Sequence, residues 1–127
     1  MVEDGLFQNI TSNVMKAPAG PSDRDTAKID AGILAMLPDR SHKAQAPSEF
    51  VPTGRWTPQE ALDHFLKSRA RTVAFLQSTP DLREHVTDSP FGQKLDAYEW
   101  VLFIGGHSER HTKQILEVKA DPNFPKN

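Results

Sequence analysis

The longest regular hydrophobic pattern of the chain lies between residues 95 and 119. This stretch contains no proline, and its apolar residues recur at the three- and four-residue spacing of an α-helix. At about 100° per residue, one stripe of this helix collects a mixed set of side chains. They are Trp100, Phe103, Ile104, His107, His111, Gln114, Ile115 and Val118. Tyr98, Val101 and Leu102 add apolar surface on other sides. We therefore expect the first half of the helix to be buried on several sides and both histidines to face a core.

A second long helix is predicted from Pro58 to about Ser78. The segment Thr57-Pro58-Gln59-Glu60 is a capping box with proline at the first helical position, which marks a helix start. The expected apolar stripe consists of Leu62, Phe65, Leu66, Val73 and Leu76. Two shorter helices are predicted over residues 2–15 and 25–37, and Pro38 stops the second of them.

The remaining segments read as connections. Proline and small polar residues mark loops over 17–22 and 39–54, a turn over 89–92 and a tail over 121–125. A short helical fragment is expected over 82–86. No alternating run predicts a strand, and no internal repeat is present. The pattern predicts an all-α, bundle-like fold with a single domain spanning residues 1–127.

The predicted helices do not fill a bundle evenly. Two are long and two are short, whereas the helices of a four-helix bundle are usually of similar length. The first one begins at the start of the chain with apolar residues already in place, and the helix over 95–119 carries more apolar surface than one partner covers. Both features predict a second chain that completes the core, and so a homodimer.

The amino-acid composition limits the classes of function that fit this chain. The 127 residues include 15 basic and 17 acidic side chains, a net charge of −2 that argues against nucleic acid or an anionic membrane as a partner. Without cysteine, a metal site has only histidine, carboxylate and water as ligands. The first residues lack the basic and apolar regions of a signal peptide, and no segment reaches membrane-spanning length. These features predict a soluble cytoplasmic protein.

His107 and His111 are the candidate functional residues. Four residues apart on a helix, their side chains point the same way, about 6 Å apart along the axis, and can share one metal ion. Glu109 lies about 160° around the helix from His107, so the pair does not match the His-Glu-x-x-His motif of metalloproteases. The alternative is a pair of core histidines bonded to backbone or carboxylate groups.

Several segments resemble the DinB-like (DinB/YfiT-type) superfamily of metalloenzymes, over essentially the whole chain. The resemblance is carried by the following segments: residues 3–8 (EDGLFQ), 35–41 (AMLPDRS), 52–56 (PTGRW), 95–100 (LDAYEW), 107–112 (HSERHT) and 117–125 (EVKADPNFP). The resemblance implies a four-helix bundle that binds a divalent metal, often zinc or nickel, through three histidines. His107 and His111 match the two that the family places on its last long helix.

The family pattern places the third histidine just upstream of the Glu3-Asp4-Gly5 segment. The chain therefore looks like an N-terminally shortened member, with the first helix and the start of the second missing, in which the metal site is incomplete and the metal can be absent. Trp56, Glu60 and His64 repeat the spacing found around a family ligand, but His64 is a weak candidate because it lies off the predicted apolar stripe and is expected to face solvent, as are His42 and His85.

Two functional hypotheses follow. The resemblance implies a metal-dependent transferase, such as the thiol-dependent S-transferases among its relatives, or a hydrolase, in which a metal on His107 and His111 activates a water or a thiolate on a small-molecule substrate. The alternative is a non-catalytic bundle or oligomerisation module with an incomplete metal site. The sequence identifies neither substrate nor general base. Glu109 and Glu117 are interpreted as surface charges, and Gln114 as a pocket-lining residue or a satisfied core amide.

Overall fold

The computed structural model describes residues 2–43, 45, 48, 51 and 53–125. Within them lie four α-helices: α1 (Val2–Ser12), α2 (Thr26–Met36), α3 (Pro58–Ser78) and α4 (Ala97–Ala120). A 3₁₀ turn, η1 (Val14–Lys16), follows α1, and two short strands, β1 (Val86–Asp88) and β2 (Lys94–Asp96), precede α4. The all-α class predicted from the sequence is confirmed, with α1 ending earlier than expected and continuing as η1.

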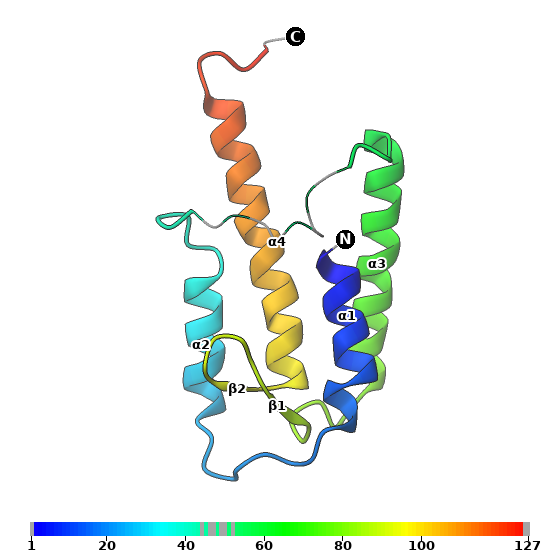
Figure 1. The fold of residues 1–127 in the computed structure, drawn as a ribbon, viewed down its shortest axis with the longest axis vertical. Helices are drawn as coiled ribbons and strands as arrows, with labels where there is room; N and C mark the ends of the chain where they lie inside the picture. Colours follow the sequence, from blue (N-terminus) through cyan, green and yellow to red (C-terminus); the bar gives the residue numbers. More distant parts are fainter. Residues whose placement is uncertain (1, 44, 46–47, 49–50, 52, 126–127) are drawn as a thin grey trace.

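Helix α4 is the centre of the fold. It packs against α2 on one side and α1 on the other, and α3 packs against α1 (Figure 1). The core lies at the end of the molecule where α4 begins. Its buried side chains are Ile10, Val14, Ile33, Leu82, Leu95, Ala97, Trp100, Val101 and Ile104. The expectation that the first half of this helix is buried on several sides is therefore confirmed.

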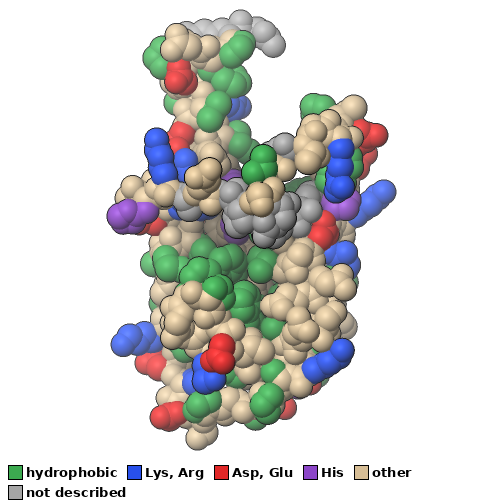
Figure 2. Space-filling view, in the orientation of Figure 1, with side chains coloured by type: hydrophobic (Ala, Val, Ile, Leu, Met, Phe, Trp, Pro, Cys, Tyr) green, Lys and Arg blue, Asp and Glu red, His purple; other side chains and the backbone are tan. Residues whose placement is uncertain are grey.

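The second half of α4 extends beyond α1 and α2 (Figure 1). Every residue from His111 to Ala120 is exposed, and Figure 2 shows hydrophobic side chains at the surface of this projection. At the boundary between the halves, Gly106 lets α2 approach closely, because a Cβ there would lie 2.9 Å from the Cβ of Leu37. Gly105, by contrast, faces open space within the described chain.

The predicted capping box of α3 is confirmed, since Thr57 accepts from the backbone of Glu60 and Glu60 accepts from the backbone of Thr57. The predicted apolar stripe is partly wrong. Leu62, Leu66 and Val73 are 50%, 54% and 42% exposed, whereas the buried residues of α3 are Ser68 and Thr72. The buried face lies about 90° around the helix from the expected one. It is turned because the acidic first turn of α1 offers polar partners to these two hydroxyls.

The segment before α4 forms a small antiparallel hairpin, where the sequence predicted a helical fragment over 82–86 and no strand. Val86 pairs with Asp96 and Asp88 with Lys94, and Gly92 closes the connection with φ 77°. Strands of three residues are too short to show a period-two pattern. Trp100 donates from Nε1 to the hydroxyl of Thr87, which attaches the hairpin to α4.

The connection between α2 and α3 contains no α-helix or strand in its described part, as predicted for 39–54, although residues 44, 46–47, 49–50 and 52 of that loop lie outside the described residues. None of the helices in the described chain combines the length and apolarity needed to cross a bilayer.

Candidate metal centre

The structure brings His107 and His111 together. Their Nε2 atoms are 3.0 Å apart, and the two rings meet edge to face with centroids separated by 4.5 Å. Both side chains leave α4 from the same face one turn apart, as the spacing predicted. Two Nε2 atoms directed at one another are the arrangement from which one cation can be held by both imidazoles.

The environments of the two rings differ. His107 is partly buried and stacks on Phe103, with ring centroids 6.5 Å apart, and Phe103 stacks in turn on Phe91. Burial lowers the pKa of His107, and the neighbouring His111 and Arg110 lower it further. His107 is therefore held in the neutral form that can bind a metal.

His111 is exposed, so the prediction that both histidines face a core is wrong for this residue. The cause is that α1 covers α4 over only part of its length. The first turn of α1 lies level with Ser108, which is joined to Glu3 through Arg69. Beyond this level the stripe of α4 has no helix of the described chain over it. A hydrogen bond orients the ring instead, because Nδ1 of His111 lies 2.9 Å from Oε1 of Gln114.

The described residues bring no third ligand to this pair. Among them, no group of three or more histidine, aspartate or glutamate side chains could hold a metal ion. His64, the weak candidate, lies on α3 with Nε2 2.8 Å from Oδ2 of Asp4 and its ring against Trp56. Its side chain is bonded to α1 and is still 38% exposed, so the expected solvent-facing position is only partly confirmed. His42 is exposed as expected, whereas His85 is partly buried with both ring nitrogens bonded.

The first turn of α1 supplies a polar cluster that the sequence did not reveal. Glu3 is 6% exposed and accepts from both Nε and Nη2 of Arg69 and from the hydroxyl of Thr72. Arg69 also donates to Ser108, the residue after His107, at 2.6 Å. The cluster ties α1, α3 and α4 together beside the histidines. The only sequence signal for it is the acidic pair at the start of a helix, which usually indicates a solvated first turn.

Asp4 forms the neighbouring tie between α1 and α3. Its carboxylate accepts from Ser68 and Arg71 and contacts His64. Burial alone would raise the pKa of Asp4, but these three hydrogen bonds outweigh it and hold that pKa well below its usual range. Asp4 is thus a charged anchor for α1, and it occupies the nitrogen of His64 that would otherwise be offered to a metal.

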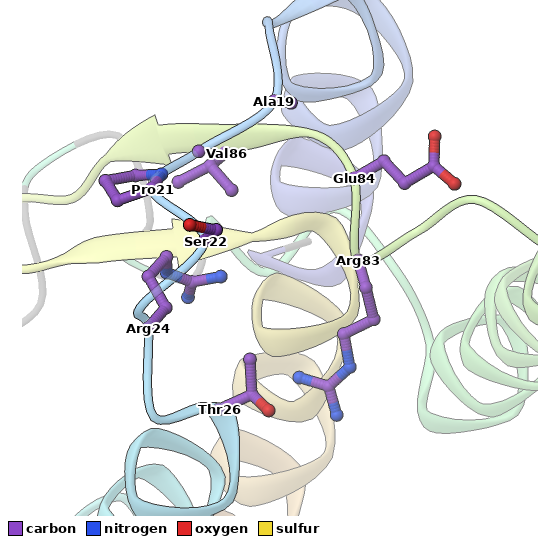
Figure 3. Close-up of a pocket in the computed structure, with 9 residues that line it drawn as sticks. Ala19, Pro21, Ser22, Arg24, Thr26, Arg83, Glu84 and Val86 are labelled. Carbon is purple, nitrogen blue, oxygen red and sulfur yellow. The ribbon is translucent and has the colours of Figure 1, made fainter.

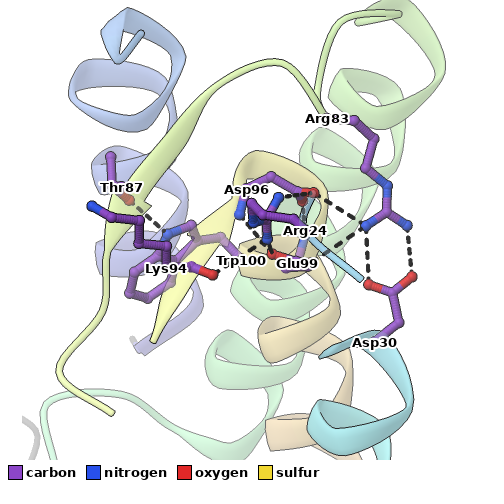
Figure 4. A network of polar contacts seen from close by, with 8 residues as sticks. All are labelled: Arg24, Asp30, Arg83, Thr87, Lys94, Asp96, Glu99 and Trp100. Carbon is purple, nitrogen blue, oxygen red and sulfur yellow. Dashed lines mark hydrogen bonds and ion pairs between the residues drawn. The ribbon is translucent and has the colours of Figure 1, made fainter. Parts of the chain in front are cut away.

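A second polar network lies at the other end of α4 (Figure 4). Asp96 and Glu99 are fully buried and form a reciprocal capping box at the start of this helix. Arg24 and Arg83 pair with both carboxylates, and Arg83 also pairs with Asp30. Burial raises the pKa of Glu99, although the Arg24 guanidinium opposes this rise. The network fixes the connection before α2 against the start of α4.

Two cavities elsewhere in the described chain offer alternative sites. One, of about 360 Å³, opens beside Arg24 and Arg83 (Figure 3), but both guanidinium groups are directed to buried carboxylates and leave no free positive charge for an anion. The other, of about 250 Å³, is lined by residues of α2, α3 and α4 that include Gly105 and Glu109. These two residues lie on the side of α4 away from the histidines. Neither cavity adjoins the histidine pair.

Comparison with known proteins identifies the family of the chain. A sequence profile described as the DinB superfamily matches residues 8–115, which include His107 and His111. The chain is similar to the uncharacterised protein YuaE of Bacillus subtilis (strain 168), with 28% identity over 99 residues, 76% of this chain. It spans 61% of the length of that relative. No solved structure matches the chain significantly.

Proposed function

Since this chain belongs to the DinB superfamily, we propose that it binds a divalent metal ion through Nε2 of His107 and Nε2 of His111. The observation that carries the proposal is the 3.0 Å separation of these two atoms on one face of α4. The proposed ion is zinc or nickel, since imidazole nitrogen suits both metals and the chain has no thiolate.

The donor pair fits such an ion. Zinc binds imidazole nitrogen at about 2.0–2.1 Å in tetrahedral geometry, which places two ligand nitrogens about 3.3 Å apart. The observed pair reaches this distance with a small rotation of either ring. The remaining positions would be filled by water, by substrate, or by a ligand from another segment or chain. Two protein ligands alone predict weaker binding than the three usual in zinc enzymes.

The chemistry that a bound ion supplies is Lewis-acid activation of a water or a thiolate. The residues of this chain contribute the parts that precede such a step. Burial keeps His107 neutral, Phe103 stacks against its ring, and Gln114 bonds to His111. We extend the proposal to a metal-dependent transferase or hydrolase in the cytoplasm, acting on a small molecule. No general base is assigned.

The proposal is tested by metal content and affinity on protein prepared without a histidine tag. We expect the wild-type chain to bind zinc or nickel, and His107→Ala and His111→Ala each to abolish binding, as measured by isothermal titration calorimetry and elemental analysis. His42→Ala is the matched control, because His42 is also exposed but lies outside the pair. Equal metal binding by the His111→Ala variant and by wild type would refute the proposal.

A second candidate function is favoured by the uncovered second half of α4. Ile115 and Val118 continue the stripe of Trp100 and Ile104, yet they are 59% and 53% exposed. We propose that a second copy of the chain covers this surface, as a homodimer in which the partner can add a ligand beside His111. This role requires no catalysis, and it is compatible with metal binding.

Sedimentation equilibrium tests the homodimer with two adjacent substitutions. Ile115 and Leu116 are equally exposed, at 59% each, but only Ile115 lies on the stripe. We expect Ile115→Lys to shift the protein to monomer and Leu116→Lys to leave the dimer intact. A monomeric wild type, or a loss of dimer in both variants, would contradict an interface built on the stripe.

A further inference from the structure

The orientation of His111 depends on a residue one turn further along α4. Nδ1 of His111 lies 2.9 Å from Oε1 of Gln114, and Nε2 of the same ring lies 3.0 Å from Nε2 of His107. The amide oxygen of Gln114 can only accept a hydrogen bond, so Nδ1 of His111 must carry the proton. A neutral imidazole has one N–H, and Nε2 of His111 is therefore a free lone pair directed at His107.

We infer that Gln114 is the positioning residue that holds His111 in the Nδ1–H tautomer, so that Nε2 is presented as the metal-binding atom. The consequence of this inference for metal binding rests on the proposed function. The tautomer itself is a property of the metal-free chain. Metal-binding histidines usually have the second ring nitrogen bonded to a carboxylate, a carbonyl or water, which fixes ring orientation and tautomer. In this chain an amide has that role.

The two histidines are held by different means. His107 is fixed by its partly buried position and by stacking on Phe103, and among the described residues no hydrogen bond holds its Nδ1. His111 is exposed and has no comparable packing. Its orientation therefore relies on Gln114, and the loss of this acceptor should affect His111 more than any nearby packing change.

In the metal-free chain the proton between the two Nε2 atoms belongs to His107, which donates it to the lone pair of His111. For Nε2 of His107 to serve as a ligand as well, that proton would have to move to Nδ1 of the same ring by exchange with water, which would leave both imidazoles neutral. His111 needs no such rearrangement, because Gln114 already selects the tautomer that binds.

The test uses two substitutions at Gln114 and one control. Gln114→Ala removes the acceptor, Gln114→Glu replaces it with a charged one, and Gln77→Ala removes an exposed glutamine of α3 far from the pair along the chain. Because the side chains of Gln114 and Gln77 are both exposed, we expect unchanged melting temperatures in all three variants. Tautomers of His111 are read from ¹⁵N chemical shifts of the metal-free protein, and zinc affinity from calorimetry with zinc chloride alone.

We expect Nδ1–H in wild type, a mixture of tautomers in Gln114→Ala, and zinc affinity about 10–100-fold weaker in that variant. Gln114→Glu should bind at least as tightly as wild type, and Gln77→Ala should be unchanged. An unchanged tautomer in Gln114→Ala, or zinc binding equal to wild type, would overturn the inference. If the wild type binds no zinc but shows the Gln114-dependent tautomer, the proposed metal function fails and the positioning role of Gln114 stands.

Discussion

The two halves of α4 carry one hydrophobic stripe into two different environments. From Ala97 to Gly106 the helix is enclosed by α1, α2 and the hairpin, and the carboxylates of this region are buried with arginines. From His111 onward the same stripe is exposed, and its charged residues form solvent-facing ion pairs. Amphipathic pattern alone therefore specifies which side of a helix can be covered, and only the neighbouring elements decide how far the cover extends.

The residues that stabilise the fold and the residues of the candidate site lie in different parts of α4. The enclosed half holds the residues whose loss should unfold the chain, whereas the histidine pair lies where enclosure ends. A ligand site needs access to solvent and residues fixed in place, and this boundary offers both. Three pairs of matched residues test whether the two halves differ in this way.

The largest difference is expected between two arginines. Arg24 is 11% exposed and pairs with the fully buried Asp96 and Glu99. Arg24→Ala leaves Arg83 as the one arginine paired with these two carboxylates and should cost about 3–5 kcal/mol of unfolding free energy. Arg40 pairs with Glu117, which is 52% exposed, so Arg40→Ala should have a much smaller effect on the unfolding free energy than Arg24→Ala. Urea unfolding of both variants measures the difference, and similar losses would mean that the two networks are equally solvated.

A second pair compares isoleucines on the same stripe. Ile104 is 2% exposed in the core, and Ile104→Ala should lower the unfolding free energy by about 2–5 kcal/mol. Ile115 is 59% exposed, and Ile115→Ala should stay within about 0.5 kcal/mol at a protein concentration where the chain is monomeric. A loss above 1 kcal/mol for Ile115→Ala under these conditions would show that its surface is covered within one chain.

Sequence reasoning predicted what local chemistry determines. The helix starts at Pro58, and the register that brings His107 to His111 follows from capping and from helical spacing, which need only neighbouring residues. The solvated charges at Glu109 and Glu117 followed from the same pattern. The capping box of Asp96 and Glu99 is equally local, but its burial is not, because it depends on Arg24 from another part of the chain.

What the sequence did not reveal depends on distant partners. Ser68 and Thr72 are polar and would be expected at the surface, but Asp4 and Glu3 bond to them from α1, more than 60 residues earlier. The same tie turns His64 toward α1 and away from the role of a third ligand. His111 is the opposite case. It lies on the apolar stripe but is exposed, because a position on the stripe is buried only where another helix covers it.

The smallest effect is expected for the pH dependence of two histidines, measured in the metal-free protein with EDTA. His85 bonds the carbonyl of Ala17 and the carboxylate of Asp81, with Glu84 nearby, and its pKa is raised. Its contribution to stability is then complete below the unfolded-state pKa of about 6.5 and is lost as the pH rises through the higher folded-state value. His107, with its lowered pKa, has the opposite sign. The unfolded chain takes up a proton below about pH 6.5 while the folded chain resists it, so acid reduces stability.

Urea unfolding at about pH 5.5 and about pH 8, on either side of the ordinary histidine pKa, separates the two contributions. Relative to wild type, His85→Gln should be more destabilising at the lower pH, because it removes a favourable protonated contact. His107→Gln should be less destabilising at the lower pH, because it removes a side chain whose burial opposes protonation. If both variants changed the pH dependence in the same direction, His107 would be as solvated as the exposed half of α4. The boundary between the two halves would then lie before His107, and the candidate site would lose the partial enclosure that keeps one of its ligands neutral.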